Sequence, residues 1–328
     1  MIKLSTLCEQ YLIEQWWLSD STKETTQRAF KYLAKTIGDL LIDRVTYRHG
    51  EQYKGWLLQY GSSKNTVNMY LRAMKPVFGW AVKIEMLKAN PLVQCRQLKI
   101  TRKPIRLYEE YEFDQLMRFA PNDRWRAILM AARTTGLRRG ELLNLTRDNI
   151  RNGFVFVEPK RNTDRTWEWE SKDKELRNVP VIAPLVEMFS KLDCYYPLLS
   201  ARRYETLLRL KKAGLLTGRK RRCPYENFRR DFVMIQKKAF GRQIGDFHSF
   251  RKTYITDMVN QLPVHFVARL SGHSDVRTLV TYYTTTQDKQ YEQARQAALD
   301  AVKTGCCPYI PKNTPVGDTG LEPVASCV

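Results

Sequence analysis

The chain has 328 residues, enough for two domains with separate cores, and its 55 Lys and Arg residues against 34 Asp and Glu residues give a formal net charge of +21. That excess predicts a polyanionic partner. A membrane surface would satisfy the same charge, but no apolar run approaches the roughly twenty residues that cross a bilayer, and no membrane partner is expected. The seven cysteines form no C-x-x-C pair, which indicates neither a disulfide framework nor a zinc site and favours a reducing, cytoplasmic setting.

The first part of the chain has the apolar periodicity of helices. Apolar residues at helical spacing predict a first helix around Leu4–Leu12, and Ser21-Thr-Lys-Glu24 resembles a capping box that opens a second helix. A third helix is expected around Tyr53–Tyr60 and a fourth over residues 65–85. We therefore predict a small helical domain over residues 1–98.

A basic segment without helical periodicity, residues 99–106, follows this domain and contains one proline. Its composition is typical of an interdomain linker. We predict that this linker contacts phosphate, and a linker that is merely solvated is the alternative.

The pattern changes after Leu107. Two helices are predicted over residues 109–119 and 123–133, and the turn signal Asn152-Gly153 lies between Asn149-Ile150 and Phe154–Val157. Thr166–Glu170 and Leu176–Val181 both alternate with period two. Together these segments predict a small three-stranded antiparallel sheet in an otherwise helical domain, residues 107–303, so the fold class is mainly α with a small antiparallel β-sheet.

Residues 192–224 form a basic, poorly patterned segment, for which a solvated loop and a DNA contact are equally good interpretations. After this segment, helical spacing returns. The tail, residues 304–328, contains Pro, Gly and Cys and is expected to be disordered. The helices predicted between the two cover residues 225–239, 249–261, 264–271, 276–284 and 287–303.

Arg138 lies in the segment Thr135-Gly-Leu-Arg-Arg-Gly-Glu-Leu142, where Gly136 is a predicted helix stop. A guanidinium is a planar fork that suits two non-bridging phosphate oxygens. Glu141, three residues later, either holds that fork in place or forms a simple helical ion pair. Taken alone, Arg138 is more often a surface arginine.

His248-Ser-Phe-Arg251 places an imidazole and a guanidinium on one helical face, while Phe250 and Tyr254 are predicted to enter the core. Further along, Gly272 is a predicted helix stop directly before His273. Tyr282 follows His273 by nine residues, with Tyr283 beside it. For either tyrosine, an aromatic side chain in the core or at an interface is the alternative interpretation.

Together these segments closely resemble the tyrosine recombinase (phage integrase) family. Its pattern is an arginine in a T-G-L-R-x-x-E-L box, a β-turn lysine, H-x-x-R, G-H and a tyrosine nine residues later; the matching residues are Arg138, Lys172, His248, Arg251, His273 and Tyr282. The N-terminal helices also resemble the core-DNA-binding domain of this family, through Ser63–Asn68 leading into Phe78–Val82.

Two departures from the family pattern stand out. Many members have leucine where Phe250 stands and histidine where Lys252 stands, but neither is one of the six catalytic positions. Met1 lies close to the start of the core-binding domain, so the arm-binding domain of some phage integrases is not expected.

The resemblance implies a mechanism. Tyr282 would attack a DNA phosphodiester and hold a 3′-phosphotyrosyl bond, and Arg138 and Arg251 would clamp the scissile phosphate. His273 would add a hydrogen bond, His248 would take the tyrosine proton, and Lys172 would protonate the departing 5′ oxygen. The family needs neither metal nor other cofactor, because bond energy is conserved in the phosphotyrosyl link.

The resemblance also implies partners. These are duplex DNA with a specific recombination site and a homotetramer on two synapsed duplexes, with or without an accessory DNA-bending protein. The helix Gln287–Lys303 is expected either to dock on a neighbouring subunit or to pack on its own domain. The residues expected to contact DNA are Lys64, Arg72, Lys75, Arg102 and Lys103.

Two other functions share parts of this signature. One is a non-catalytic DNA-binding or architectural protein, and the other is a type IB-like topoisomerase that relaxes DNA without recombining it. The complete set of six residues favours a recombinase. A cytoplasmic, nucleoid-associated protein that integrates or excises a mobile element is preferred over one that resolves chromosome dimers, because the basic segment and the long tail depart from a compact minimal enzyme.

Overall fold

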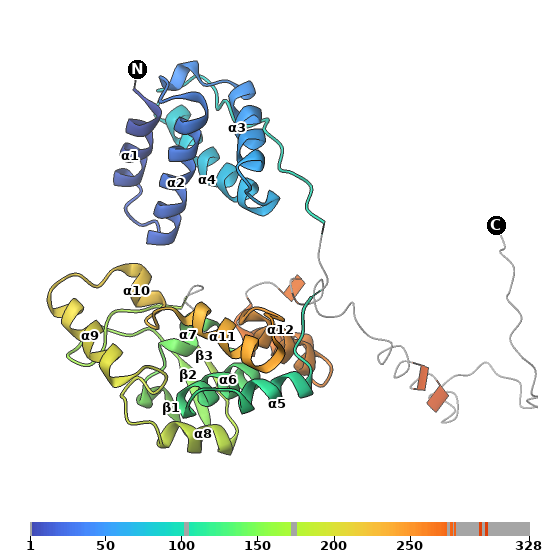
Figure 1. Ribbon diagram of the computed structural model, residues 1–328. Coiled ribbons are helices and arrows are strands. Elements are labelled where there is room, and N and C mark those ends of the chain that lie inside the picture. The colour runs from blue at the N-terminus through green and yellow to red at the C-terminus, as the bar shows by residue number, and fades with distance from the viewer. Residues whose placement is uncertain are drawn as a thin grey trace, which may run out of the picture. The chain divides into compact units, whose positions relative to one another are not determined.

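The structure is a computed structural model and describes residues 2–101, 105–171 and 176–273, with the short stretches 276–277, 279, 295–296 and 299–300 (Figure 1). Several predicted features lie outside these residues. They are Arg102, Lys103, Lys172, Tyr282, Tyr283, most of the helices predicted over 276–284 and 287–303, and the tail.

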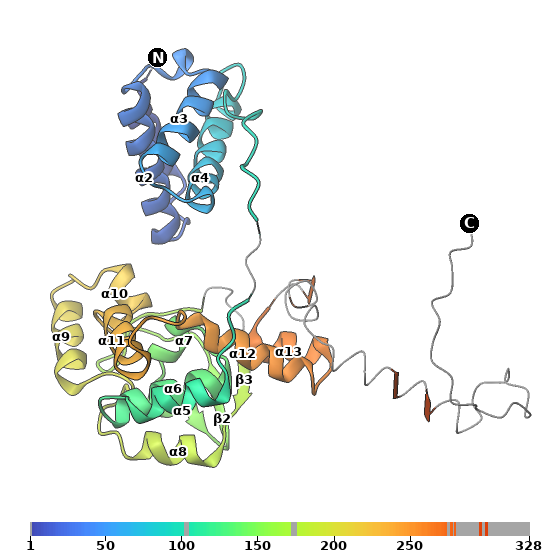
Figure 2. The same cartoon turned by 45° about the vertical axis from the view of Figure 1, so that its right-hand side comes forward.

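Four helices form near the N-terminus, as expected (Figure 2): α1 (Leu4–Glu14), α2 (Asp20–Ile37), α3 (Tyr47–Gln59) and α4 (Lys64–Lys83), with the short 3-10 turn η1 (Ile42–Arg44). The predicted capping box at Ser21 is wrong. Ser19, in extended conformation, is the N-cap instead, and its Oγ accepts a hydrogen bond from the Thr22 N–H over 3.2 Å. Ser19 lies one position before the helix begins, and its side chain satisfies a backbone N–H of the first turn.

The N-terminal helices enclose their own core. Leu4 and Leu7 of α1 are fully buried, and Phe30 of α2 stacks on Phe78 of α4 with ring centroids 5.7 Å apart. The Tyr53 hydroxyl donates to the Ala29 carbonyl, so the one polar atom of this buried ring is satisfied. Burial of each such side chain contributes about 1.5–3 kcal/mol, and all the buried apolar residues of this cluster lie between Leu4 and Cys95.

The remaining described elements surround a second core. Trp125 and Ile128 of α6, Val155 of β2, Val179 of β3 and Phe250 of α12 all belong to it. Helix α6 lies beside α8 in both views (Figures 1 and 2). The helices are α5 (Glu110–Arg118), α6 (Asp123–Thr135), α7 (Arg139–Leu143), α8 (Ala183–Ser190), α9 (Ala201–Lys212), α10 (Gly218–Arg222), α11 (Phe228–Phe240), α12 (His248–Val259) and α13 (Val264–Ser271).

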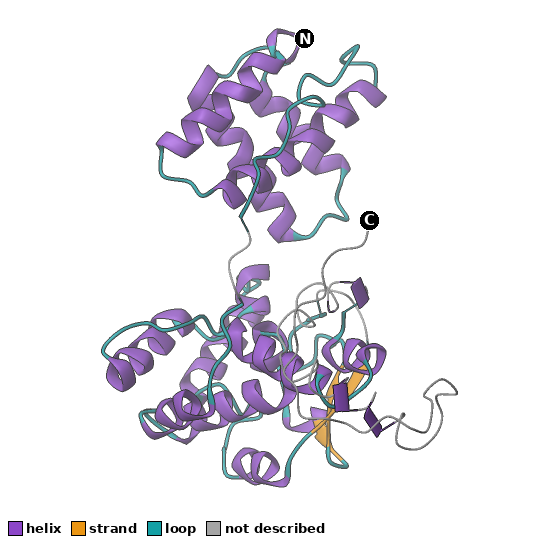
Figure 3. Cartoon of the chain, turned by 90° about the vertical axis from the view of Figure 1, so that its right-hand side faces the viewer, coloured by secondary structure: helices purple, strands orange, loops and turns teal. Residues whose placement is uncertain are grey.

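A three-stranded antiparallel sheet of order β1-β2-β3 lies within this part (Figure 3). Asn152 and Gly153 join β1 to β2 with φ values of 53° and 74°, the positive values that a tight hairpin turn requires. Val155 pairs with Val179, so both valines point into the core. The strands are β1 (Ile150–Arg151), β2 (Phe154–Val157) and β3 (Arg177–Pro180), and the 3-10 turn η2 (Arg147–Asn149) leads into β1.

The strand predicted at Thr166–Glu170 does not join this sheet. Its alternation is real, because Trp167 and Trp169 are both buried, but its ladder is a single bridge between Trp169 and Lys160. Trp167 stacks on Tyr196 with centroids 4.3 Å apart. Side-chain packing therefore holds this segment in place where the prediction had a ladder.

The segment 192–224 is also not a loop, since it contains α9 and α10. Ser200 caps α9 and Thr217 caps α10, each accepting from a backbone N–H of the first turn. The helical pattern was weak because only Leu207 of α9 is fully buried and α10 buries no residue. The other residues of these two helices are exposed or half-exposed.

Helix α12 crosses from one compact unit, which ends at Tyr254, into a second unit that begins at Ile255. Gly272 ends α13 in the left-handed conformation with φ 64°, as predicted. Within the described ranges, no helix combines the length and apolar character of a membrane span.

Candidate active site

Arg138 lies at the sharp turn between α6 and α7. Gly136 ends α6 with φ 60° and Arg138, in extended conformation, precedes the first turn of α7. A Cβ added to Gly136 would lie 2.2 Å from Cδ1 of Tyr254, so the α12 aromatic ring closes over the glycine. Both the backbone conformation and this contact require glycine, which confirms the predicted helix stop.

Glu141 binds Arg138 twice. Its Oε2 accepts the Arg138 backbone N–H over 2.8 Å, and its Oε1 accepts from Arg138 Nη1 over 3.0 Å. The carboxylate is buried, whereas the Arg138 side chain keeps 22% of its surface exposed. The two alternatives for Glu141 thus resolve toward a residue that both caps α7 and fixes the Arg138 guanidinium.

A second arginine completes this cluster and was not foreseen. Arg177, the first residue of β3, donates from Nη2 to Glu141 Oε2 over 2.5 Å, and its side chain is 5% exposed. Burial would raise the pKa of Glu141, but the charge and hydrogen bond of Arg177, followed by those of Arg138, outweigh it and lower the pKa below the ordinary value. Glu141 is therefore an anion between two cations.

The sequence does carry a signal for Arg177. It shares strand parity with Val179, which faces the core, so period-two alternation places an arginine on the buried face. A buried guanidinium needs a carboxylate partner, and Glu141 is the buried carboxylate that supplies it.

Arg251 is held against the same turn. Its residue surface is 2% exposed, and its Nη1 donates to the Gly136 carbonyl over 2.8 Å. Phe250 and Tyr254 of α12 are buried as predicted, and Tyr254 packs on the same Gly136 that Arg251 binds. Arg251 is thus fixed by the backbone two residues before Arg138, and the structure brings these two predicted residues to one turn.

His248 is the exposed first residue of α12. Partial desolvation lowers the pKa of its imidazole, and the positive charges of Arg251, Lys252 and Arg138 lower it further, against a smaller opposite effect of Asp246. The ring is consequently neutral at pH 7 and able to accept a proton. His248 opens the helix that carries Arg251, three residues later on the same face.

His273 directly follows the Gly272 stop. Its Nδ1 lies 2.7 Å from Ser271 Oγ, and its backbone N–H donates to the Ala268 carbonyl over 3.0 Å. These contacts fix the imidazole at the end of α13. Lys172 and Tyr282 lie outside the described residues, and the structure therefore does not place them.

Lys160, three residues after the end of β2, has a structural role. Its Nζ donates to the Asn144 carbonyl and to Asn149 Oδ1, and lies 5.0 Å from the centroid of the Tyr196 ring. Burial lowers its pKa to about 7, although Glu158 and Asp148 act in the opposite direction. The ammonium ties the end of α7 to the turn before β1.

A basic groove of about 750 Å³ lies next to Arg138 along the chain, lined by residues of α7, α9, α10 and α11 and their connections. Only one carboxylate, Glu226, is among its lining residues, and it pairs with Arg203 over 2.7 Å. The groove is thus strongly cationic, which suits an anionic polymer. Its cationic lining residues are Arg139, Arg203, Arg219, Lys220, Arg222 and Arg229.

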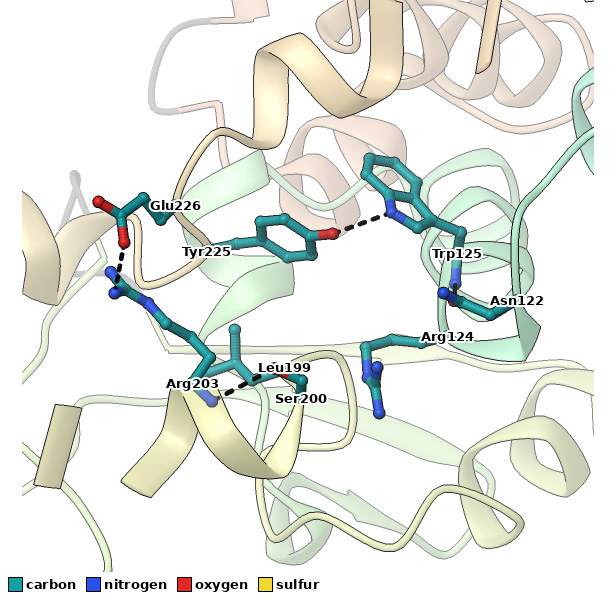
Figure 4. Close-up of a pocket in the computed structure, with 8 residues that line it drawn as sticks. All are labelled: Asn122, Arg124, Trp125, Leu199, Ser200, Arg203, Tyr225 and Glu226. Carbon is teal, nitrogen blue, oxygen red and sulfur yellow. Dashed lines mark hydrogen bonds and ion pairs between the residues drawn. The ribbon is translucent and has the colours of Figure 1, made fainter. Parts of the chain in front are cut away.

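A smaller pocket shares Arg203, Tyr225 and Glu226 with this groove (Figure 4). Its volume is about 160 Å³, and Trp125 Nε1 donates to the Tyr225 hydroxyl at its edge over 2.9 Å. None of the predicted catalytic residues lines it. This pocket is therefore separate from the predicted catalytic residues.

The predicted DNA-contacting residues of α4 share one side of the helix. At 100° per residue, Lys64, Arg72 and Lys75 fall within a sector of about 80°. Lys64 and Arg72 are exposed, whereas Lys75 is half-buried and donates to the Val93 carbonyl over 3.1 Å. This face of α4 presents at least two cations to solvent.

Comparison with known proteins gives matches over both halves of the chain. The model of the phage integrase family matches residues 106–290, and that of the phage integrase SAM-like domain matches residues 4–100. ICEBs1 integrase of Bacillus subtilis (strain 168) is 31% identical over 128 residues, which are 38% of this chain and 34% of that protein. This match therefore spans about a third of the relative. A XerC-like tyrosine recombinase of Caldanaerobacter subterraneus is 24% identical over 286 residues, covering 76% of this chain and 70% of that protein.

Solved structures share the fold. A Tn1549 transposon integrase in complex with a circular intermediate DNA has a TM-score of 0.69 at 16% identity, over 90% of this chain and 100% of that chain. A lambda integrase dimer bound to a COC′ core site has a TM-score of 0.65 at 15% identity, over 84% of this chain and 97% of that chain.

Proposed function

This chain belongs to the phage integrase family of tyrosine recombinases, and from that membership we propose that it cleaves and rejoins DNA at specific sites to integrate or excise a mobile element. The observation that carries the proposal is the cluster at one turn. Arg138 is fixed by Glu141 and Arg251 is fixed by the Gly136 carbonyl, beside a neutral His248.

Arg138 and Arg251 are the residues that bind the scissile phosphate. Two guanidiniums supply fixed N–H donors for the non-bridging oxygens, whose negative charge grows as the nucleophile attacks. Because both side chains are held by protein contacts before DNA arrives, little reorganisation accompanies the reaction. His273, positioned by Ser271, adds a third donor.

Tyr282 is the nucleophile. Its phenol oxygen forms a bond to phosphorus while the bond from phosphorus to the 5′ oxygen breaks, which leaves a 3′-phosphotyrosyl link. The phenol proton passes to the neutral imidazole of His248, and Lys172 gives a proton to the departing 5′ oxygen. A 5′ hydroxyl of another strand then reverses these steps, so the number of phosphodiester bonds is unchanged.

Duplex DNA is the partner that the charge distribution supports. In the division we propose, the N-terminal domain (residues 1–98) and the catalytic domain (107–303) both contact the duplex. The basic linker (99–106), with Arg102 and Lys103, follows the DNA backbone. On α4, Lys64 and Arg72 are exposed for such contacts. Most contacts of this kind position the protein on DNA and do not read its sequence.

Four protomers on two duplexes form the complex that recombines in this proposal. A lambda integrase of the same fold has been solved as a tetramer bound to a Holliday junction, with a TM-score of 0.64 to this chain. The Gln287–Lys303 helix is the segment we assign to contact between neighbouring subunits. An accessory DNA-bending protein is a further partner in this proposal, and the cytoplasm is its place of action.

Recombination between two plasmid-borne copies of the DNA that flanks the coding region tests this function. The expected product is an inverted or excised segment, formed without metal or nucleotide. Relaxation of any supercoiled plasmid without recombination would instead indicate a topoisomerase. Binding without strand cleavage would indicate an architectural protein.

A further inference from the structure

We propose that Arg177 is a positioning residue for strand cleavage, which neutralises Glu141 so that the charge of Arg138 remains available to the DNA phosphate. This inference rests on the proposed function. Arg177 is well placed for such a role. Its backbone pairs with Val157 in the sheet, and its side chain is buried with Nη2 2.5 Å from Glu141 Oε2.

Arg138, Glu141 and Arg177 together carry a net charge of +1, whereas Arg138 and Glu141 alone would be neutral. Without Arg177, a buried carboxylate would have one cationic partner, and a phosphate could bind Arg138 only by competing with Glu141. With Arg177 present, Glu141 orients Arg138 without cancelling its charge.

The contacts of the Glu141 carboxylate support the same role. Glu141 Oε2 accepts from both the Arg138 N–H and Arg177 Nη2, and Oε1 accepts from Arg138 Nη1. Arg177 therefore fixes the rotation of the carboxylate, and the carboxylate fixes both the first turn of α7 and the Arg138 fork. A lysine can supply the charge, but a guanidinium supplies it with a defined direction.

Four variants test this role: Arg177→Met, Arg177→Lys, Glu141→Gln and the double variant Arg177→Met/Glu141→Gln. The assay measures single-turnover cleavage at saturating DNA, together with DNA affinity and thermal stability. Arg177→Met is expected to slow cleavage about 10- to 100-fold, in line with the loss of one fixed interaction, while DNA affinity changes less than about threefold. Arg177→Lys should recover part of the rate.

The double variant separates positioning from mere structural support. Glu141→Gln removes the anion that competes for Arg138, so the double variant should cleave faster than Arg177→Met alone. If Arg177 only satisfies a buried carboxylate, the rates of Arg177→Met and of the double variant will follow their thermal stabilities, and folded Arg177→Met will cleave as fast as wild type. That outcome would overturn the proposal.

Arg147→Met is a matched control. Arg147 is an exposed arginine whose guanidinium also makes protein hydrogen bonds, but it donates to the carbonyls of Cys194 and Leu192 and not to Glu141. It should lower stability and leave the cleavage rate of the folded protein unchanged. If the wild-type protein cleaves DNA and Arg177→Met cleaves equally well, only this inference fails. If the wild-type protein forms no cleaved product on its site, the proposed function fails first.

Discussion

Arg251 Nη1 donates a hydrogen bond of 2.8 Å to the Gly136 carbonyl, which joins the first turn of α12 to the end of α6. Arg138 follows this carbonyl by two residues, so one backbone turn sets the positions of both guanidiniums. A change in this turn is consequently felt by both proposed phosphate ligands, although they are more than a hundred residues apart in the chain.

Gly136→Ala should destabilise the protein strongly. A left-handed backbone costs a non-glycine residue about 1–2 kcal/mol, and the new methyl group would overlap the Tyr254 ring, which adds about 1–3 kcal/mol. Urea unfolding measures the total. Gly153→Ala is the matched control, because Gly153 also has a positive φ but a methyl group placed there would meet no atom within 4 Å; it should show only the first cost. Equal losses in the two variants would contradict the tight contact at Gly136.

His248 should titrate below the ordinary histidine value of 6.5, because desolvation and the charges of Arg251, Lys252 and Arg138 lower its pKa. The chain has four histidines, so NMR spectra of the DNA-free protein, with His248→Gln for assignment, measure this pKa directly. A value at or above 6.5 would contradict the expected environment. In cleavage assays His248→Gln should be slower by about 100-fold or more, the usual contribution of a general base.

Lys160 should make stability depend on pH. Its folded-state pKa of about 7 is below the 10.5 of a free lysine. Between these values the unfolded chain binds more protons, so the free energy of unfolding that this site contributes rises with pH. The difference between wild type and Lys160→Met in urea unfolding should therefore grow in favour of wild type from pH 7 to pH 9.5. Parallel pH profiles would mean that Lys160 is not desolvated.

The basic groove should contribute to the salt dependence of DNA binding. Removal of one phosphate contact reduces the slope of log K against log salt by about 0.9. Arg219→Gln/Arg222→Gln is thus expected to reduce the slope by up to about 1.8 on a nonspecific duplex. Lys191→Gln is the control, since Lys191 is exposed at the end of α8, pairs with Glu187 and does not line the groove. An unchanged slope in the groove variant would exclude DNA from the groove.

The elements that the sequence predicted well are those with an apolar stripe. Helix α13 begins and ends where expected, and Gly136 and Gly272 end their helices in the left-handed conformation that favours glycine. Helix α9 was not predicted, because a helix with a single fully buried residue, Leu207, has no apolar stripe in its sequence. The Trp167 segment was assigned to the sheet because alternation reports burial and does not report which strand, if any, lies alongside.

The site shows the same division. The family pattern selected Arg138 and Arg251, which the structure brings to one turn, and His248, which begins the helix of Arg251. Arg177 was not predicted, although period-two alternation places it on the same buried face of β3 as Val179. Lys160 had no local signal at all, since its hydrogen-bond partners come from a turn that only tertiary packing brings near.

The covalent protein–DNA adduct is the most direct measure of the central claim. The protein is incubated with a nicked duplex that carries its flanking site, and the trapped complex is digested and mapped by mass spectrometry. We expect the phosphodeoxynucleotide on Tyr282, no adduct in Tyr282→Phe, and an undiminished adduct in Tyr283→Phe. An adduct that persists in Tyr282→Phe and disappears in Tyr283→Phe would contradict the assignment of the nucleophile, and no adduct in any variant would contradict the enzyme.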